Sequence, residues 1–246
     1  MFPLSDDRTR LAVTPVVTWS IIGACFLVFL WQSSLGAKAG EIALYHYGMI
    51  PARLFGLAKL RSHFVAIPAS ATVLTSMFLH GGWLHLGLNM LFLWVFGGKV
   101  EDSMGHPRFL IFYLLCGVGA AVAQAIMNPG STLPMVGASG AISGVLGAYF
   151  FLHPLSNIRV LFFLGFIPIV ARVPALIFLG LWFAAQLASA TFSILSEPGV
   201  AVWAHVGGFL TGMLLTPLLR QNTVKLLQPR YSRAFQIERE QGPWSM

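Results

Sequence analysis

The chain has 246 residues, of which 57% are hydrophobic and only 9% are charged. A soluble domain typically carries about 25% charged residues to cover its surface, so this composition excludes an ordinary soluble domain, a disordered chain and a disulfide-stapled secreted module. It indicates a polytopic membrane protein, and the net charge of +7 is better explained by membrane topology and attraction to anionic lipid than by nucleic-acid binding.

Six stretches without charged side chains are candidates for transmembrane helices, each of which needs about 20 apolar residues. In chain order the predicted spans are Val16–Leu35, His80–Gly98, Phe109–Met127, Ser139–His153, Val173–Ser196 and Pro198–Leu219. The turn-forming segment Met127–Pro134 divides the third span from the fourth. The sequence therefore predicts an all-α membrane protein, a bundle of six transmembrane helices.

The segments outside the spans complete the predicted organisation around a six-span domain of residues 14–220. The first extracytoplasmic loop, residues 36–70, is long and partly apolar, and we expect part of it to lie in the outer leaflet. The run Val160–Ala171 is too short to span and is expected to lie in the interface as part of a connecting segment. Residues 1–13 are predicted to be a cytoplasmic segment and residues 221–246 a cytoplasmic tail, either disordered or a short surface helix.

Basic residues predict the orientation. When both termini are placed in the cytoplasm, eleven of the fifteen Lys and Arg residues fall on the cytoplasmic side. The four on the outside all belong to the first loop: Lys38, Arg53, Lys59 and Arg61. Because cytoplasmic loops carry the excess of positive charge, cytoplasmic termini are predicted.

Polar side chains inside the predicted spans form three clusters. The second span holds His80, His85 and Asn89, and the last two share one helix face because they are four residues apart. Ser139 begins the fourth span, and His205 lies in the first third of the sixth. These three spans run in the same direction, so their polar groups lie at comparable depth. If the helices touch, they bring together a nucleophile, a general base and oxyanion donors, the groups that acyl transfer requires.

Glycine spacing makes such contact plausible. Gly140 and Gly144 repeat four residues apart, as do Gly208 and Gly212. Small residues at this spacing let membrane helices approach closely. Ser139 at a helix start would also have unpaired backbone N–H groups beside it, at the positive end of the helix dipole.

Simpler roles remain open for each polar residue. Ser139 could be a helix N-cap, and His205 could make a polar contact between helices. His85 and Asn89 could bond to each other or to backbone groups. His80 is expected to be structural, joining the first loop to the second span.

At these positions the chain resembles bacterial rhomboid intramembrane serine proteases. The motifs are Gly137-Ala138-Ser139-Gly140, Ala204-His205-x-x-Gly208-x-x-x-Gly212, the spacing of His80, His85 and Asn89, and Gly98-x-x-Glu101-x-x-x-Gly105. All four occur in the family's order, and the similarity covers roughly residues 14–220.

The resemblance implies a serine–histidine dyad that forms an acyl-enzyme. Ser139 would be the nucleophile, and His205 the general base that later protonates the leaving amine. The oxyanion would be held by the Ser139 backbone N–H and by the side chains of His85 and Asn89. The implied substrates are single-span membrane proteins, cut in their transmembrane segments at a site that opens to the extracytoplasmic side of a bacterial inner membrane.

No cofactor or metal is expected, because the sequence contains no ligand-spaced set of Cys, His, Asp and Glu residues. The only two cysteines, Cys25 and Cys116, lie in apolar runs and are interpreted as packing residues.

The chain departs from the family pattern one helical turn after the serine. Well-known members carry an aromatic side chain there that stacks on the catalytic histidine, and this chain has Ser143. Another group must therefore orient His205: Ser143 itself, a water or a neighbouring side chain. The first loop reads Met49-Ile-Pro-Ala-Arg53 and lacks the Trp-Arg pair of some members, so details of gating are not carried over.

Two other functions are possible for a polytopic membrane protein with polar groups in its spans. An ion-coupled transporter would be expected to carry carboxylates within its spans, and none of the eight acidic residues lies deep in one. A rhomboid-like pseudoenzyme that binds membrane proteins without cutting them should lack the serine or the histidine, and this chain keeps both.

Overall fold

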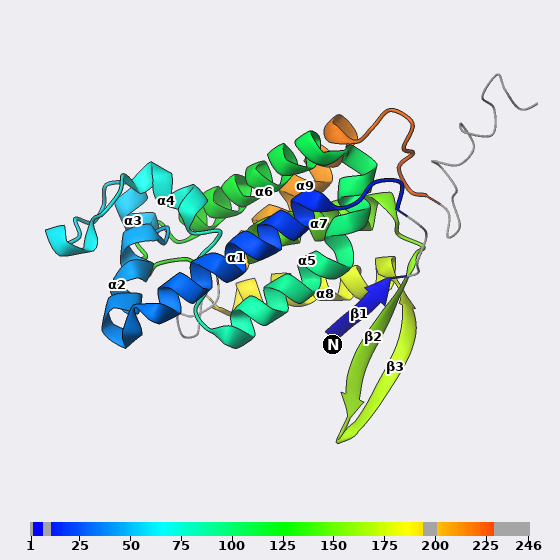
Figure 1. Ribbon diagram of the computed structural model, residues 1–246, viewed down its shortest axis with the longest axis horizontal. Helices are drawn as coiled ribbons and strands as arrows, with labels where there is room; N and C mark the ends of the chain where they lie inside the picture. Colours follow the sequence, from blue (N-terminus) through cyan, green and yellow to red (C-terminus); the bar gives the residue numbers. More distant parts are fainter. Residues whose placement is uncertain (1, 7–10, 194–200, 229–246) are drawn as a thin grey trace, which may run out of the picture.

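The computed structural model describes residues 2–6, 11–193 and 201–228, and it shows a bundle of helices with a small sheet at one end (Figure 1). The bundle is formed by α1 (Val16–Ser34), α5 (Trp83–Met104), α6 (His106–Met127), α7 (Ser139–Leu152), α8 (Ala175–Ser193) and α9 (Val202–Leu219). Each of these helices overlaps one of the predicted spans, and the boundary between the last two spans, Ser196–Pro198, lies outside the described residues. In the described part, α1, α6 and α9 are long and apolar enough to cross a membrane. The prediction of a mostly helical protein with several apolar helices is confirmed.

Helix α5 continues past its predicted end at Gly98 because the charged side chains of its last turns are paired. Lys99 Nζ lies 2.8 Å from the carboxylate of Asp6. The buried carboxylate of Glu101 accepts hydrogen bonds of 2.9 and 2.8 Å from two backbone N–H groups in the first turn of α1. Helix starts leave such N–H groups without partners inside the helix, so this carboxylate caps α1 and fixes it to α5.

The segment between α1 and α5 forms short helices at the end of the bundle opposite the sheet (Figure 1). They are α2 (Gly36–Tyr47), α3 (Pro51–Leu54), the 3₁₀ helix η1 (Ser62–Phe64) and α4 (Ala69–Thr75). Met49 pairs with Met135 through two backbone hydrogen bonds, which joins this segment to the chain that leads into α7. The segment is therefore attached to the chain just before the N-terminal end of α7.

The prediction of an all-α protein is wrong between α7 and α8. Strands β2 (Asn157–Leu164) and β3 (Ile167–Pro174) form an antiparallel hairpin there, and β1 (Phe2–Asp6) pairs with the other edge of β2. The predicted interfacial segment Val160–Ala171 is thus part of a sheet, and the predicted N-terminal segment supplies a strand.

Local chemistry accounts for the hairpin. Its two-residue turn is Gly165-Phe166, and Gly165 has a φ of +63°, as the first position of a type II′ turn requires. Proline is compatible with β3 because β3 is an edge strand. The run was predicted to lie in the interface because it is too short to span a membrane. The available signal for a hairpin was Gly165 between two short stretches of aromatic, leucine and β-branched residues.

The first residues of the predicted tail pack against the bundle. Gln221 donates its N–H to the carbonyl of Ser103 at 2.9 Å, and Leu227 donates to the carbonyl of Phe151 at 3.0 Å. The prediction of disorder or a surface helix is wrong for residues 221–228, and its remainder, residues 229–246, lies outside the described chain.

Candidate active site

Helices α7 and α9 approach so closely that their backbones are in contact. A Cβ atom placed on Gly208 would collide with the carbonyl oxygen of Gly140, and one placed on Gly212 would collide with the carbonyl oxygen of Gly144. The two glycine pairs found in the sequence therefore face each other across this interface. No larger residue at 208 or 212 fits without moving a backbone.

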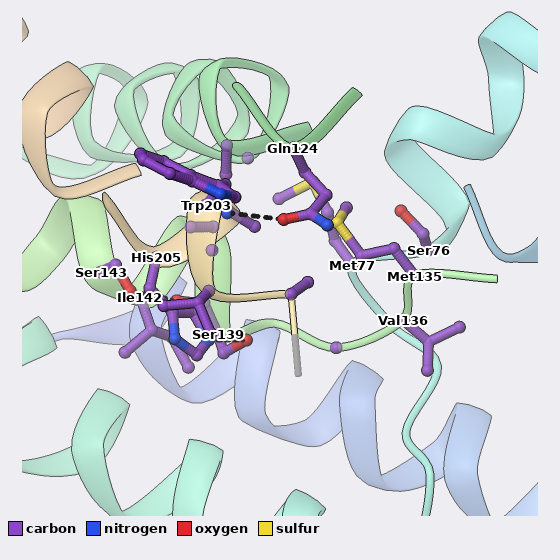
Figure 2. A pocket seen from close by; sticks show the side chains of 18 of the residues that line it. Ser76, Met77, Gln124, Met135, Val136, Ser139, Ile142, Ser143, Trp203 and His205 are labelled. Atoms are coloured by element: carbon purple, nitrogen blue, oxygen red, sulfur yellow. Dashed lines mark hydrogen bonds between the residues drawn. The ribbon is translucent and has the colours of Figure 1, made fainter. Parts of the chain in front are cut away.

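This close approach brings Ser139 and His205 together. Ser139 is the first residue of α7, and His205 lies in the first turn of α9. The distance from Ser139 Oγ to His205 Nε2 is 2.9 Å, and both side chains lie beside the same hollow in Figure 2. The structure thus places the predicted nucleophile within hydrogen-bonding distance of the predicted base.

The other imidazole nitrogen of His205 is held by a residue of α8. Nδ1 lies 2.9 Å from the side-chain oxygen of Gln186. With an amide oxygen opposite it, Nδ1 carries the proton and donates, so Nε2 is unprotonated and accepts from the Ser139 hydroxyl. The Trp182 ring, one turn before Gln186, lies 6.1 Å from the imidazole, centroid to centroid.

Gln186 was missed by the sequence analysis. The available signal was an amide within the predicted fifth span, since a polar residue at membrane depth is by default a functional hypothesis. The sequence of this span, however, does not indicate which neighbouring helix Gln186 faces.

Ser143, the residue that replaces the family's stacking aromatic, is bonded within its own helix. Its hydroxyl donates to the carbonyl oxygen of Ser139 at 2.7 Å. Among the orienting groups left open by the sequence, the one that contacts the imidazole nitrogen is the neighbouring side chain Gln186.

His85 and Asn89 line the same cavity as Ser139. The N–H of Gly81 points to His85 Nδ1 at 3.3 Å, so Nδ1 is the acceptor and Nε2 carries the proton. Asn89 Nδ2 donates one hydrogen to the carbonyl of His85 at 3.0 Å and has a second that this bond does not use. Two N–H donors of α5 are therefore available at the cavity.

A glycine separates the imidazole of His85 from the Ser139 hydroxyl. Gly137 has a φ of +124°, and a Cβ atom there would lie 2.8 Å from the His85 ring. Glycine is therefore required on both grounds, backbone conformation and space.

His80 lies beside the site and is fully buried. Gln32 donates from Nε2 to the His80 carbonyl at 2.8 Å, and the His80 ring lies 5.3 Å from that of His85. These contacts join the segment before α5 to the end of α1. The prediction was that His80 would join this segment to the first loop.

The cavity has a volume of about 690 Å³. Gln124 and Met135 line it across from Ser139 and His205 (Figure 2). The Gln124 side-chain oxygen accepts a 3.2 Å hydrogen bond from the N–H of Ala204, which fixes the start of α9 to α6. The arrangement can transfer a proton from a serine hydroxyl to an imidazole beside a space large enough for a peptide segment.

Comparison with known proteins gives a consistent result. A family model described as the Rhomboid domain matches residues 69–222. RHOMBOID-like protein 4 of Arabidopsis thaliana is 33% identical over 171 residues, which is 70% of this chain and 37% of that protein. Rhomboid protease GluP of Bacillus subtilis is 36% identical over 147 residues, 60% of this chain and 25% of that protein. Rhomboid protein 1 of Saccharomyces cerevisiae, a mitochondrial protein, is 29% identical over 179 residues, 68% of this chain and 47% of that protein. The chain thus spans less than half the length of each of these relatives.

The glycine contact predicts a large effect of one methyl group. Gly208→Ala should destabilise the protein by about 1–3 kcal/mol, because α7 and α9 must separate to admit the new Cβ. The midpoint of thermal unfolding in detergent, followed by tryptophan fluorescence, should fall by several degrees. Gly87→Ala is the matched control, since a Cβ there enters open space. Equal midpoints for the two variants would contradict the interpretation.

Proposed function

The chain belongs to the rhomboid family, and from this premise we propose that it is an intramembrane serine protease that acts through a Ser139–His205 dyad. The proposal rests mainly on the 2.9 Å hydrogen bond between Ser139 Oγ and His205 Nε2 at the wall of the cavity. The relative Rhomboid protease GluP is named as a protease, which supports the proposal.

In the proposed reaction His205 Nε2 takes the proton of the Ser139 hydroxyl as the oxygen attacks a peptide carbonyl. The tetrahedral intermediate collapses to an acyl-enzyme, and the imidazolium returns the proton to the leaving amine. Water, deprotonated by the same nitrogen, then hydrolyses the ester and releases Ser139. The tautomer favoured by the Gln186 contact supports this direction of proton transfer, because Nε2 is the free base.

The developing oxyanion would be stabilised by three N–H groups. They are the backbone N–H of Ser139, at the start of α7, and the side-chain donors His85 Nε2 and Asn89 Nδ2. Donors fixed in advance at the position where charge develops are usually the largest single contribution to such catalysis.

We assign to Gln186 the orienting role that an aspartate has in a serine–histidine–aspartate triad. The amide oxygen holds Nδ1–H and so fixes the ring and its tautomer. A neutral amide does this without placing a charge in a membrane-embedded site, where an unpaired carboxylate would be costly.

The proposed substrates are single-span membrane proteins cut within the transmembrane segment. A helical peptide hides its carbonyl groups in intrahelical hydrogen bonds, so the segment must unwind locally before attack. Small residues near the cut and a helix breaker beyond it would lower that cost.

The proposed topology has six spans, α1 and α5 to α9, with both termini in the cytoplasm of a bacterial cell and the first loop partly in the outer leaflet. The excess of basic residues on the cytoplasmic side supports the orientation. In this arrangement the candidate site opens on the extracytoplasmic side of the inner membrane.

A fluorophosphonate probe tests the nucleophile. Wild-type protein in detergent should become covalently labelled, and Ser139→Ala should not, because the probe reacts with an activated serine. In-gel fluorescence measures the label. Ser143→Ala is the matched control and should keep its label, since that hydroxyl bonds within α7. An unlabelled wild type would favour a pseudoenzyme, and labelled Ser139→Ala would remove Ser139 from the proposed role.

Asn89→Ala should lower kcat by about 10²–10³-fold with little change in KM, because the lost donor acts mainly in the transition state. Cleavage of a purified single-span protein in proteoliposomes supplies both constants. Asn128→Ala, at another residue that lines the cavity, should leave kcat near the wild-type value. A wild-type kcat for Asn89→Ala would exclude the oxyanion role.

Gln186→Met should lower kcat about tenfold, because Nδ1–H loses its acceptor and the imidazole is no longer held in one tautomer. The same proteoliposome assay measures kcat and KM, and KM should change little. Gln186→Glu keeps an acceptor oxygen in place and should retain more activity than the methionine variant. Equal losses of kcat in the two variants would indicate a packing role only.

A further inference from the structure

The β2–β3 hairpin has an apolar tip that the described part of the chain leaves uncovered. From Val160 to Ala171 no residue has a polar side chain. The relative exposure reaches 102% at Phe166, 70% at Leu164 and 65% at Ile167. Figure 1 shows the two strands extending away from the bundle at the end opposite α2–α4. Exposed apolar surface of this extent on a two-stranded ribbon marks an interaction site.

Among the residues that the structure describes, one further strand belongs to the sheet, and it covers the base of the hairpin and not its tip. β1 pairs with β2 only from Ile158 to Leu161. Beyond that point both faces of the hairpin are apolar, whereas an antiparallel sheet exposed to water on one face has polar residues on that face. The tip is therefore suited to an apolar environment on both sides.

A pair of arginines stands at the base of the tip. Arg159 and Arg172 are direct cross-strand partners, both are exposed, and neither forms a salt bridge with a described residue. Like charges directly opposite each other destabilise a strand pair unless an anion lies near both. Two cations below an apolar tip match the order of phosphate groups and acyl chains at a membrane surface.

The apolar surface also continues into a helix of the bundle. β3 ends at Pro174, and α8 begins at Ala175. Leu176, Ile177 and Leu181 of α8 are exposed, as expected of side chains that face lipid. The hairpin thus leaves the bundle where a lipid-facing helix begins.

We propose that the β2–β3 hairpin docks on the membrane, with its tip among the acyl chains of the nearer leaflet and with Arg159 and Arg172 on the headgroups of anionic lipid. Docking is shallow, because the outer edge of β3 has unpaired backbone groups that need water or headgroups as partners. This inference rests on the membrane location of the bundle and not on the proposed protease activity.

A fluorescent label at the tip tests the docking. In a background with Cys25→Ala and Cys116→Ala, Phe166→Cys is labelled with nitrobenzoxadiazole, and the protein is reconstituted in phosphatidylcholine vesicles with phosphatidylglycerol. Asn222→Cys, at an exposed polar residue after α9, is the control. The tip label should emit at shorter wavelength than the control and be quenched several-fold more by lipid spin-labelled near the top of the acyl chain. Quenching by aqueous iodide equal to that of the control would overturn the proposal.

The arginine pair allows a second test of the proposed docking. Replacing both residues, Arg159→Gln with Arg172→Gln, should reduce lipid quenching of the tip label in vesicles that contain phosphatidylglycerol and have little effect in phosphatidylcholine alone. Leu164→Cys repeats the measurement if the first labelled variant has a lowered unfolding midpoint. If the tip instead docks on a second copy, labels on two copies will show energy transfer without lipid quenching, and that result would also overturn the proposal.

Discussion

The backbone contact between α7 and α9 is the constraint on which the rest of the site depends. Serine and histidine have short side chains, so their hydrogen bond requires helix backbones closer than most residues allow. The carbonyl oxygens of Gly140 and Gly144 occupy the space that side chains at Gly208 and Gly212 would fill. Within a membrane, where apolar surfaces gain little by meeting each other, such close packing is itself a main source of helix association. The same glycines therefore serve both stability and chemistry.

A neutral hydrogen-bond chain extends from this contact to a third helix. Gln186 accepts from His205, which accepts from Ser139, so one residue each of α8, α9 and α7 fixes the direction of the proton. No step of this chain requires a buried charge in the resting state. Beside Ser139, on the far side of Gly137, His85 and Asn89 each make a hydrogen bond to a backbone group of their own segment. These local bonds orient the two side chains without contacts to distant parts of the chain.

The sequence predicts what depends on local pattern. The starts of α1 and α7 agree with the prediction because hydropathy and the turn cluster before Ser139 mark them. The pairing of Ser139 with His205 was expected from the resemblance to rhomboid proteases, and the glycine spacing in the chain made close contact of their helices plausible. The end of α5 was misplaced because Lys99 is paired there with Asp6, a partner far away in sequence. Gln186 was overlooked for the same reason. Its role depends on its contact with the His205 imidazole, and that contact is determined by how α8 packs against α9.

Helix α8 connects the β2–β3 hairpin to the candidate active site. It begins at Ala175, directly after the hairpin, and carries Gln186 about 16 Å further along its axis. A hairpin held at the membrane surface would fix the starting point of this helix, and a helix is stiff over such a length. The position of the Gln186 oxygen against His205 would then be set from one end by lipid and from the other by the packing of Trp182 beside the imidazole. Because a hydrogen bond weakens steeply with small changes in length and angle, the anchoring of α8 bears directly on how well the imidazole is oriented.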